Sequence, residues 1–96
     1  MDEGDRRFRH SRTVLWRYVG REVLVGLPSG EGVEVLAGTA GHVWRLLADQ
    51  PTLAQLSGLL GEAYGAPREV VAADVGALLE QLCSRGFVEE VAADVG

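Results

Sequence analysis

Hydrophobic and polar positions alternate in three short segments near the start of the chain. β-Branched and aromatic residues dominate Thr13 to Val19 and Glu22 to Leu27, and valine alternates with glutamate in Gly32 to Leu36. Links rich in glycine, proline and serine separate these segments, and they suit hairpin turns. Because such links are too short for a crossover connection, the pattern predicts a three-stranded antiparallel sheet.

From Thr39 onward the apolar spacing becomes helical, and three helices are expected. Thr39 is the predicted N-cap of the first, with Gly38 at the strand-to-helix corner, and Thr52 to Gln55 form a capping box that begins the second. Pro67 is the expected first residue of the third, which runs to about Ser84. The expected core stripes are Ala40, Val43, Trp44 and Leu47; Leu53, Leu56, Leu60 and Ala63; and Val71, Val75, Leu78 and Leu82.

The order of these elements predicts an α+β fold that is winged helix-turn-helix-like, with a three-stranded antiparallel sheet followed by three helices. Phe87-Val88 is expected to form a short strand or docking segment. Residues 1–11 are polar and lack periodicity, which predicts a flexible arm, residues 12–90 form the single domain, and residues 91–96 form a frayed tail. The hexapeptide VAADVG occurs at 71–76 and 91–96, and only the first copy lies in an amphipathic stripe, so only it is expected to be helical.

Composition excludes several kinds of site. The 96 residues include one cysteine, and neither Cys83 nor the two histidines, His10 and His42, have a metal-ligand spacing. No catalytic constellation is present, and GTAGH lacks the lysine and the spacing of a phosphate loop, so we expect neither a cofactor nor enzymatic activity. Without a signal sequence or the roughly 20 apolar residues that span a bilayer, the chain is expected to be cytoplasmic and without membrane contact.

A winged helix suggests DNA binding, but the charges disfavour it. Six of the nine arginines lie in the first 21 residues, whereas the third helix sets Arg68 against Glu69, Asp74 and Glu80. An acidic helix would be repelled by the phosphates of a DNA groove. His42 is expected to be a surface histidine without a partner, Trp44 a core residue, and Trp16 either core or an exposed aromatic.

Residues 33–88 resemble the PqqD-like proteins, also called RiPP recognition elements, which bind leader segments of ribosomally made precursor peptides. The resemblance rests on the strand that runs into LAGTAGHVWRLLADQPTLAQL and on LLGEAYGAPREVVAADVGALLEQLCSRGFV, whose order and spacing are more specific than either piece.

The resemblance implies a protein that receives a peptide as an added strand along its third strand and against its third helix, the mode called β-augmentation. The expected contact residues are Val33, Glu34 and Val35 on the strand, and Val71, Asp74, Leu78 and Gln81 on the helix. The implied partners are the leader segment and a modifying enzyme, which in this family is a radical-SAM protein, a lasso-peptide peptidase or a similar enzyme. A winged-helix DNA-binding transcriptional regulator remains the alternative.

Overall fold

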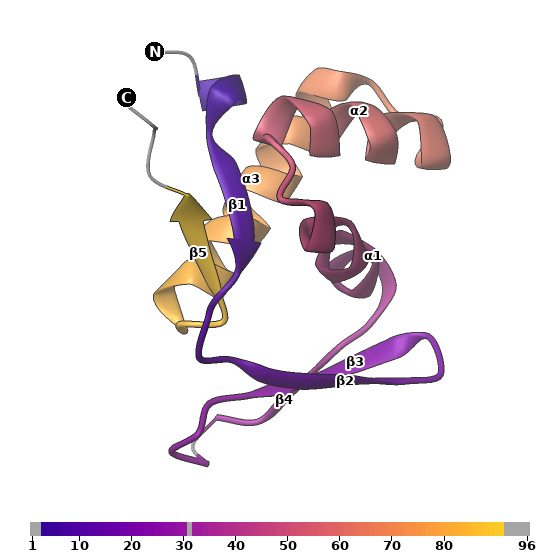
Figure 1. The fold of residues 1–96 in the computed structure, drawn as a ribbon. Coiled ribbons are helices and arrows are strands. Elements are labelled where there is room, and N and C mark those ends of the chain that lie inside the picture. The colour runs from indigo at the N-terminus through magenta and orange to yellow at the C-terminus, as the bar shows by residue number, and fades with distance from the viewer. Residues whose placement is uncertain (1–2, 31, 92–96) are drawn as a thin grey trace.

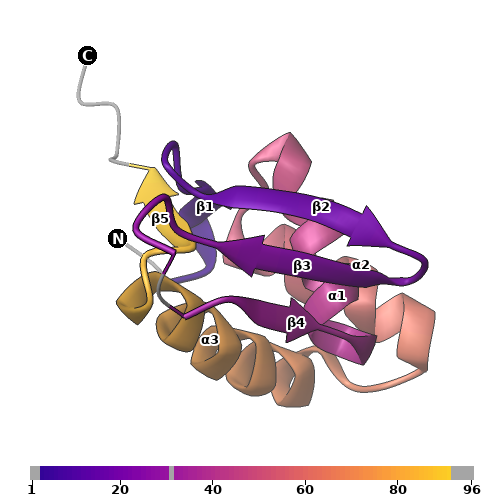
Figure 2. The ribbon, with the colours of Figure 1, turned by 90° about the horizontal axis from the view of Figure 1, so that it is seen from below.

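A three-stranded antiparallel sheet forms one layer of the fold, and three helices cover one of its faces (Figures 1 and 2). The computed structural model describes residues 3–30 and 32–91. The strands β2 (Leu15–Val19), β3 (Glu22–Gly26) and β4 (Glu34–Leu36) lie in that order, which confirms the predicted sheet. Gly20 has φ +63° in the β2–β3 turn, a conformation that glycine adopts without a Cβ clash.

The register of the sheet determines which side chains face the helices. Val23 lies opposite Tyr18 and Leu36, and Val25 lies opposite Trp16 and Glu34. Because Val23 and Val25 are fully buried, these opposed pairs belong to the face that packs against the helices.

The first helix, α1 (Gly38–Leu46), lies directly on the sheet and continues into the short 3₁₀ helix η2 (Leu47–Asp49). Gly38 has φ +57°, as expected for the tight corner, but the N-cap is Ala37, so the prediction of Thr39 as N-cap is wrong. The helix begins two residues earlier than that N-cap implies, which places Thr39 inside its first turn. A Cβ atom on Gly41 would lie 3.1 Å from the carbonyl oxygen of Leu36, so this glycine permits the close approach of helix and sheet.

The second and third helices pack against each other and against α1. In α2 (Leu53–Tyr64) the predicted capping box is present: the Thr52 hydroxyl accepts from the Gln55 N–H at 3.1 Å, and the Gln55 side chain accepts from the Thr52 N–H at 2.9 Å. Pro67 is the N-cap of α3 (Arg68–Ser84) and so precedes its first turn. Within the described residues, no helix is both long and apolar enough to cross a membrane.

Two of the predicted core positions are wrong. Ala63 is exposed, and Leu79 takes the fully buried place that was expected for Leu78. The buried stripe of α3 follows a spacing of four residues from Val71 through Val75 to Leu79, which leaves Leu78 half-buried at its border.

The N-terminal segment forms a strand, so the expectation of a flexible arm is wrong for residues 3–10. After the 3₁₀ helix η1 (Glu3–Asp5), β1 (Arg7–His10) pairs antiparallel with β5 (Val88–Val91), as Figure 1 shows. The Phe8 side chain is 2% exposed, and its N–H donates to the Pro51 carbonyl at 3.1 Å. The domain therefore extends beyond the predicted 12–90.

Ion pairs at this two-stranded ribbon neutralise two of its neighbouring arginines. Arg6 lies 2.9 Å from Glu90, and Arg9 lies 2.8 Å from Glu89. The predicted strand at Phe87-Val88 is confirmed at Val88, which begins β5, whereas Phe87 lies just before the strand. The first VAADVG copy is helical within α3 as expected; of the second, Val91 belongs to β5 and the remainder lies outside the described residues.

Trp44 occupies the centre of the single core and joins the ribbon to the sheet. Its ring is fully buried, stacks on His10 with centroids 4.1 Å apart, and meets Trp16 edge-on at 5.9 Å. Trp16 combines both expected roles, since it packs on Trp44 and is 39% exposed.

Replacing Phe8 with alanine tests whether β1 belongs to the core. We expect Phe8→Ala to lower the free energy of unfolding by about 3–5 kcal/mol, because it leaves a cavity. The matched change at an exposed position, Leu15→Ala, is expected to cost under about 0.5 kcal/mol. Urea denaturation measures both, and equal small losses would contradict the assignment of Phe8 to the core.

The environment of His10 predicts a stability that falls on acidification. Burial lowers the pKa of His10 below its usual 6.5, only partly offset by the hydrogen bond that its Nε2–H donates to the Trp44 carbonyl oxygen at 2.8 Å. As the pH falls through 6.5, the unfolded chain takes up a proton that the folded chain resists, so the free energy of unfolding decreases.

The His10→Phe variant keeps a ring on Trp44 and removes the titrating group. We expect its free energy of unfolding, measured by urea denaturation between pH 5 and pH 8, to change less with pH than that of the unmodified protein. Parallel pH profiles for the two proteins would show that another group governs the acid response.

Candidate functional site

The outer edge of β4 is an unpaired edge of the sheet within the described residues. β4 pairs with β3 on one side, and no strand of the described residues pairs with its other side. In the view of Figure 2, α3 lies next to β4, and the ion pair between Arg85 and Glu34 joins the C-terminal end of the helix to that strand. An unpaired edge presents backbone N–H and C=O groups that another extended chain can pair with.

One face of α3 is directed toward this edge, and an ion pair identifies it. The guanidinium of Arg85, at the C-terminal end of α3, pairs with the carboxylate of Glu34 in β4. Residues spaced by three, four or seven positions share one side of a helix. The residues that precede Arg85 at this spacing are Gln81, Leu78, Asp74 and Val71, the four positions expected from the sequence.

We refer to the β4 edge together with this face of α3 as the groove, and its side chains combine apolar and charged groups. Val71 is buried, Leu78 is half-buried, and Asp74 and Gln81 are exposed. The Glu34–Arg85 pair joins the two walls at one end of the groove. The sequence analysis missed Arg85, although its place seven residues after Leu78 puts it on the same helix face.

The three expected strand residues do not all face the groove. Leu36 packs in the core and Glu34 reaches α3, so their side chains lie on the helix side of the sheet. Val33 and Val35 are 58% and 57% exposed, and Val35 lies opposite Leu24 on the face away from the helices. Only the backbone of Val33 and Val35 borders the groove. Because side chains alternate between the two faces of a strand, the sequence could have predicted that Glu34 and these two valines lie on opposite faces.

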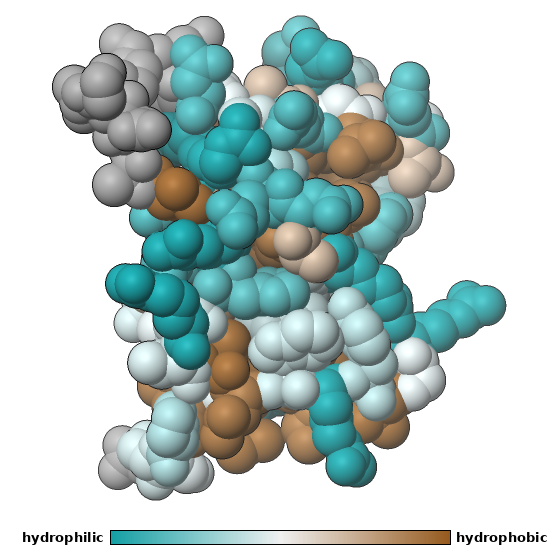
Figure 3. Space-filling view, viewed as in Figure 1, coloured by the Kyte–Doolittle hydropathy of each residue, from teal (hydrophilic) through white to brown (hydrophobic). Residues whose placement is uncertain are grey.

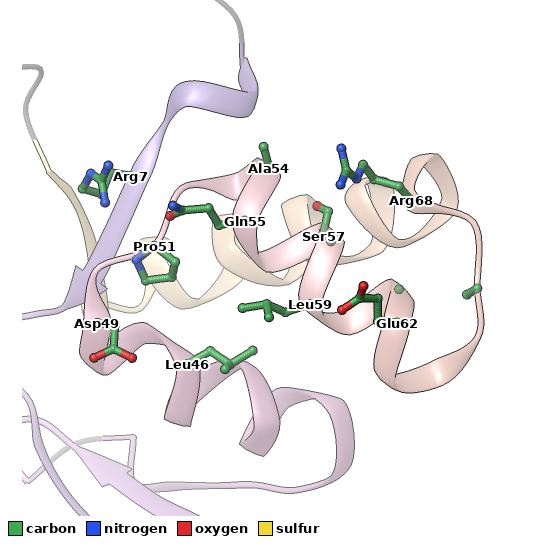
Figure 4. Close-up of a pocket in the computed structure, with 13 residues that line it drawn as sticks. Arg7, Leu46, Asp49, Pro51, Ala54, Gln55, Ser57, Leu59, Glu62 and Arg68 are labelled. Atoms are coloured by element: carbon green, nitrogen blue, oxygen red, sulfur yellow. The ribbon is translucent and has the colours of Figure 1, made fainter.

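A separate hollow of about 940 Å³ lies on the outer side of α2, away from β4. Figure 4 shows Arg7 and Arg68 at its opposite ends, with Leu59 between them. The hydroxyl of Ser57 donates to the Leu53 carbonyl at 2.7 Å within the helix, so it is engaged in backbone bonding. These side chains form no recognisable nucleophile and base pair.

The histidine and cysteine side chains away from β4 show no sign of a metal or catalytic site within the described residues. Among residues 3–30 and 32–91, no three His, Cys, Asp or Glu side chains gather as a metal site would require. His42 was expected to lack a partner, but its Nδ1 lies 3.1 Å from the Tyr64 hydroxyl. Cys83 is half-buried, and burial raises the pKa of its thiol, assisted by the nearby Glu90 carboxylate.

Comparison with known proteins gives the family. Residues 23–88 match the family described as coenzyme PQQ synthesis protein D, PqqD, over about two thirds of the chain. The chain belongs to the PqqD family. No curated protein sequence matches this PqqD-family chain.

Two solved structures share the fold. The structure of TbiB1 in complex with the TbiA(beta) leader peptide has a TM-score of 0.79 and 20% sequence identity, with 88% of this chain and 98% of that chain covered. The solution structure of the PqqD truncation of Methylobacterium extorquens PqqCD, a stand-alone RiPP recognition element, has a TM-score of 0.69 and 24% identity, with 86% and 88% covered. These likenesses confirm the predicted fold class.

The surroundings of Cys83 predict a slowly reacting thiol. A pKa raised above the usual 9.0 keeps the sulfur protonated at pH 8, and the thiolate is the nucleophile. We therefore expect iodoacetamide to alkylate the native protein several-fold more slowly than the urea-unfolded protein, as followed by mass spectrometry. Faster alkylation of the native form would identify an activated cysteine instead.

Proposed function

We propose that this PqqD-family chain binds the leader segment of a ribosomally synthesised precursor peptide and presents it to a modifying enzyme or leader peptidase. The observation that carries this proposal is the unpaired edge of β4 beside the Val71 and Leu78 side of α3. Support comes from TbiB1, a structural neighbour that forms a complex with a leader peptide.

The groove provides the two components of β-augmentation. Backbone groups of residues 33–36 supply hydrogen bonds that do not depend on the peptide sequence, and apolar side chains on α3 select alternate peptide side chains. Leu78 is the accessible apolar side chain of this wall, and Val71 lies buried at its border with the core; Asp74 and Gln81 offer polar contacts, and Glu34 and Arg85 bound one end.

In this proposal the chain acts without catalytic groups of its own. Chemistry is left to the partner, as in RiPP pathways of the lasso-peptide or PQQ type, and the binding step takes place in the cytoplasm. The Methylobacterium extorquens relative supports a separable recognition unit, because its PqqD portion is a functional stand-alone element.

The DNA-binding alternative receives no support from the family or from the groove. The exposed surface of α3 carries Glu69, Asp74 and Glu80, and Arg6 and Arg9 near the N-terminus are paired with Glu90 and Glu89. Phosphate contacts need free cationic side chains, and here much of the expected cationic cluster is neutralised.

Backbone-modified leader peptides test the proposed mode directly. The probes are synthetic leaders of precursors encoded beside PqqD-family genes, titrated by fluorescence anisotropy. In an added strand, alternate N–H groups face β4. N-methylation of the leader residues whose N–H groups face β4 should therefore abolish binding. N-methylation of the residues between them should change the dissociation constant by less than about twofold. Equal effects of both sets would contradict strand addition.

A protein variant provides the second arm of the test. Leu78→Ala should weaken leader binding about tenfold, whereas Leu59→Ala on the exposed side of α2 leaves it unchanged. The leader affinity should vary little between about 50 and 200 mM salt, and random duplex DNA should not bind. Steeply salt-dependent DNA binding without leader affinity would overturn the proposal.

A further inference from the structure

The face of the sheet that the helices leave uncovered is unusually apolar. Its exposed apolar side chains are Leu15 and Val19 of β2, Val35 of β4 and Val33 just before β4, with half-buried Leu24 of β3 between them. Figure 3 shows hydrophobic residues along the lower side of the molecule, where Figure 1 places the sheet. Contiguous exposed apolar patches of this kind mark interaction surfaces.

The patch also contains a hollow of about 420 Å³. Its walls include Leu15, Leu24, Leu27, Pro28 and Val33, so they are almost entirely apolar. Well-packed pockets of this type receive the apolar side chains that dominate the affinity of protein interfaces.

This face is continuous with the leader groove because β4 belongs to both. A strand added to β4 would alternate its side chains, one set toward α3 and the other onto the uncovered face beside Val35. The apolar face would then extend from three strands to four, and its fourth strand would be the peptide.

The uncovered face carries one charge of each sign. Arg17 lies opposite Leu24, and Glu22 lies opposite Val19 at the far end of the same strands. No ion pair of Arg17 occurs among the described residues, so a partner can pair a carboxylate with it. Because an added leader strand would extend this same face, a partner that contacts the leader as well fits it better than a second copy of this chain.

We propose that the uncovered face, defined by Leu15, Arg17, Val19, Leu24, Val33 and Val35, binds the enzyme that modifies the leader-bound precursor. This proposal rests on the proposed leader binding. The enzyme contributes apolar side chains and a carboxylate that pairs with Arg17, and it contacts the bound leader strand at the same time. It therefore recognises the loaded chain better than the empty one.

The test uses the full chain, the precursor peptide and the modifying enzyme encoded beside its gene. Isothermal titration is expected to give at least about tenfold tighter enzyme binding by the peptide-saturated chain than by the free chain. Leu15→Glu and Val19→Glu should each weaken enzyme binding at least about tenfold, yet change leader affinity less than about twofold, because β2 is two strands away from the groove.

Two controls make the test specific. Leu59→Glu alters an apolar side chain on α2 that is as exposed as Val19, at 49%, and should leave enzyme binding unchanged. Arg17→Ala should weaken enzyme binding, and Arg17→Lys should restore part of it. Circular dichroism verifies that each variant is folded.

Unchanged enzyme affinity in both β2 variants would overturn this inference, even if the leader still binds. It would also be overturned if sedimentation shows a dimer of the unmodified chain that Leu15→Glu dissociates without changing enzyme binding. Absence of leader binding in the direct titration would instead refute the proposed function, so the two failures can be told apart.

Discussion

The position of β4 between the core and α3 is the constraint on which the binding surface depends. Leu36 anchors the strand in the core, pairing with β3 fixes its direction, and the Glu34–Arg85 pair connects it to the helix. Gly41 lets α1 approach the Leu36 carbonyl closely, so the helical layer stays directly behind the strand. A three-residue strand held in this way keeps its outer edge open beside a helix face of mixed apolar and polar side chains.

The two ends of the chain complete the core that holds this arrangement. A chain of 96 residues has little apolar surface to spare, and Phe8, Phe87 and Val88 add to the core from the β1–β5 ribbon. His10 links that ribbon to Trp44, which also contacts Trp16 of the sheet. The supposed arm is thus part of the scaffold.

The fold has a winged-helix topology, but its third helix lacks the basic side chains that bind DNA. Arginines near the N-terminus meet glutamates near the C-terminus, and α3 carries acidic residues where a recognition helix would carry basic ones. The same elements that would present a helix to a groove leave a strand edge open for a peptide. The fold alone does not decide between these functions, whereas the side chains of the site do.

The sequence by itself determined the sheet, the three helices and the family, because each depends on local signals: alternation in residues 13–36, the Thr52 capping box, and motifs close together in the chain. It also proposed Val71, Asp74, Leu78 and Gln81 on one side of α3 as peptide contacts, which stays a prediction.

Only the tertiary structure decided that residues 7–10 form a strand, because their partner lies about 80 residues away and a four-residue pattern carries no trace of it. It likewise decided that Leu79 is buried in place of Leu78, and that Val33 and Val35 face away from the groove. Which side of an element is buried depends on what packs against it, and that is a property of the assembled fold.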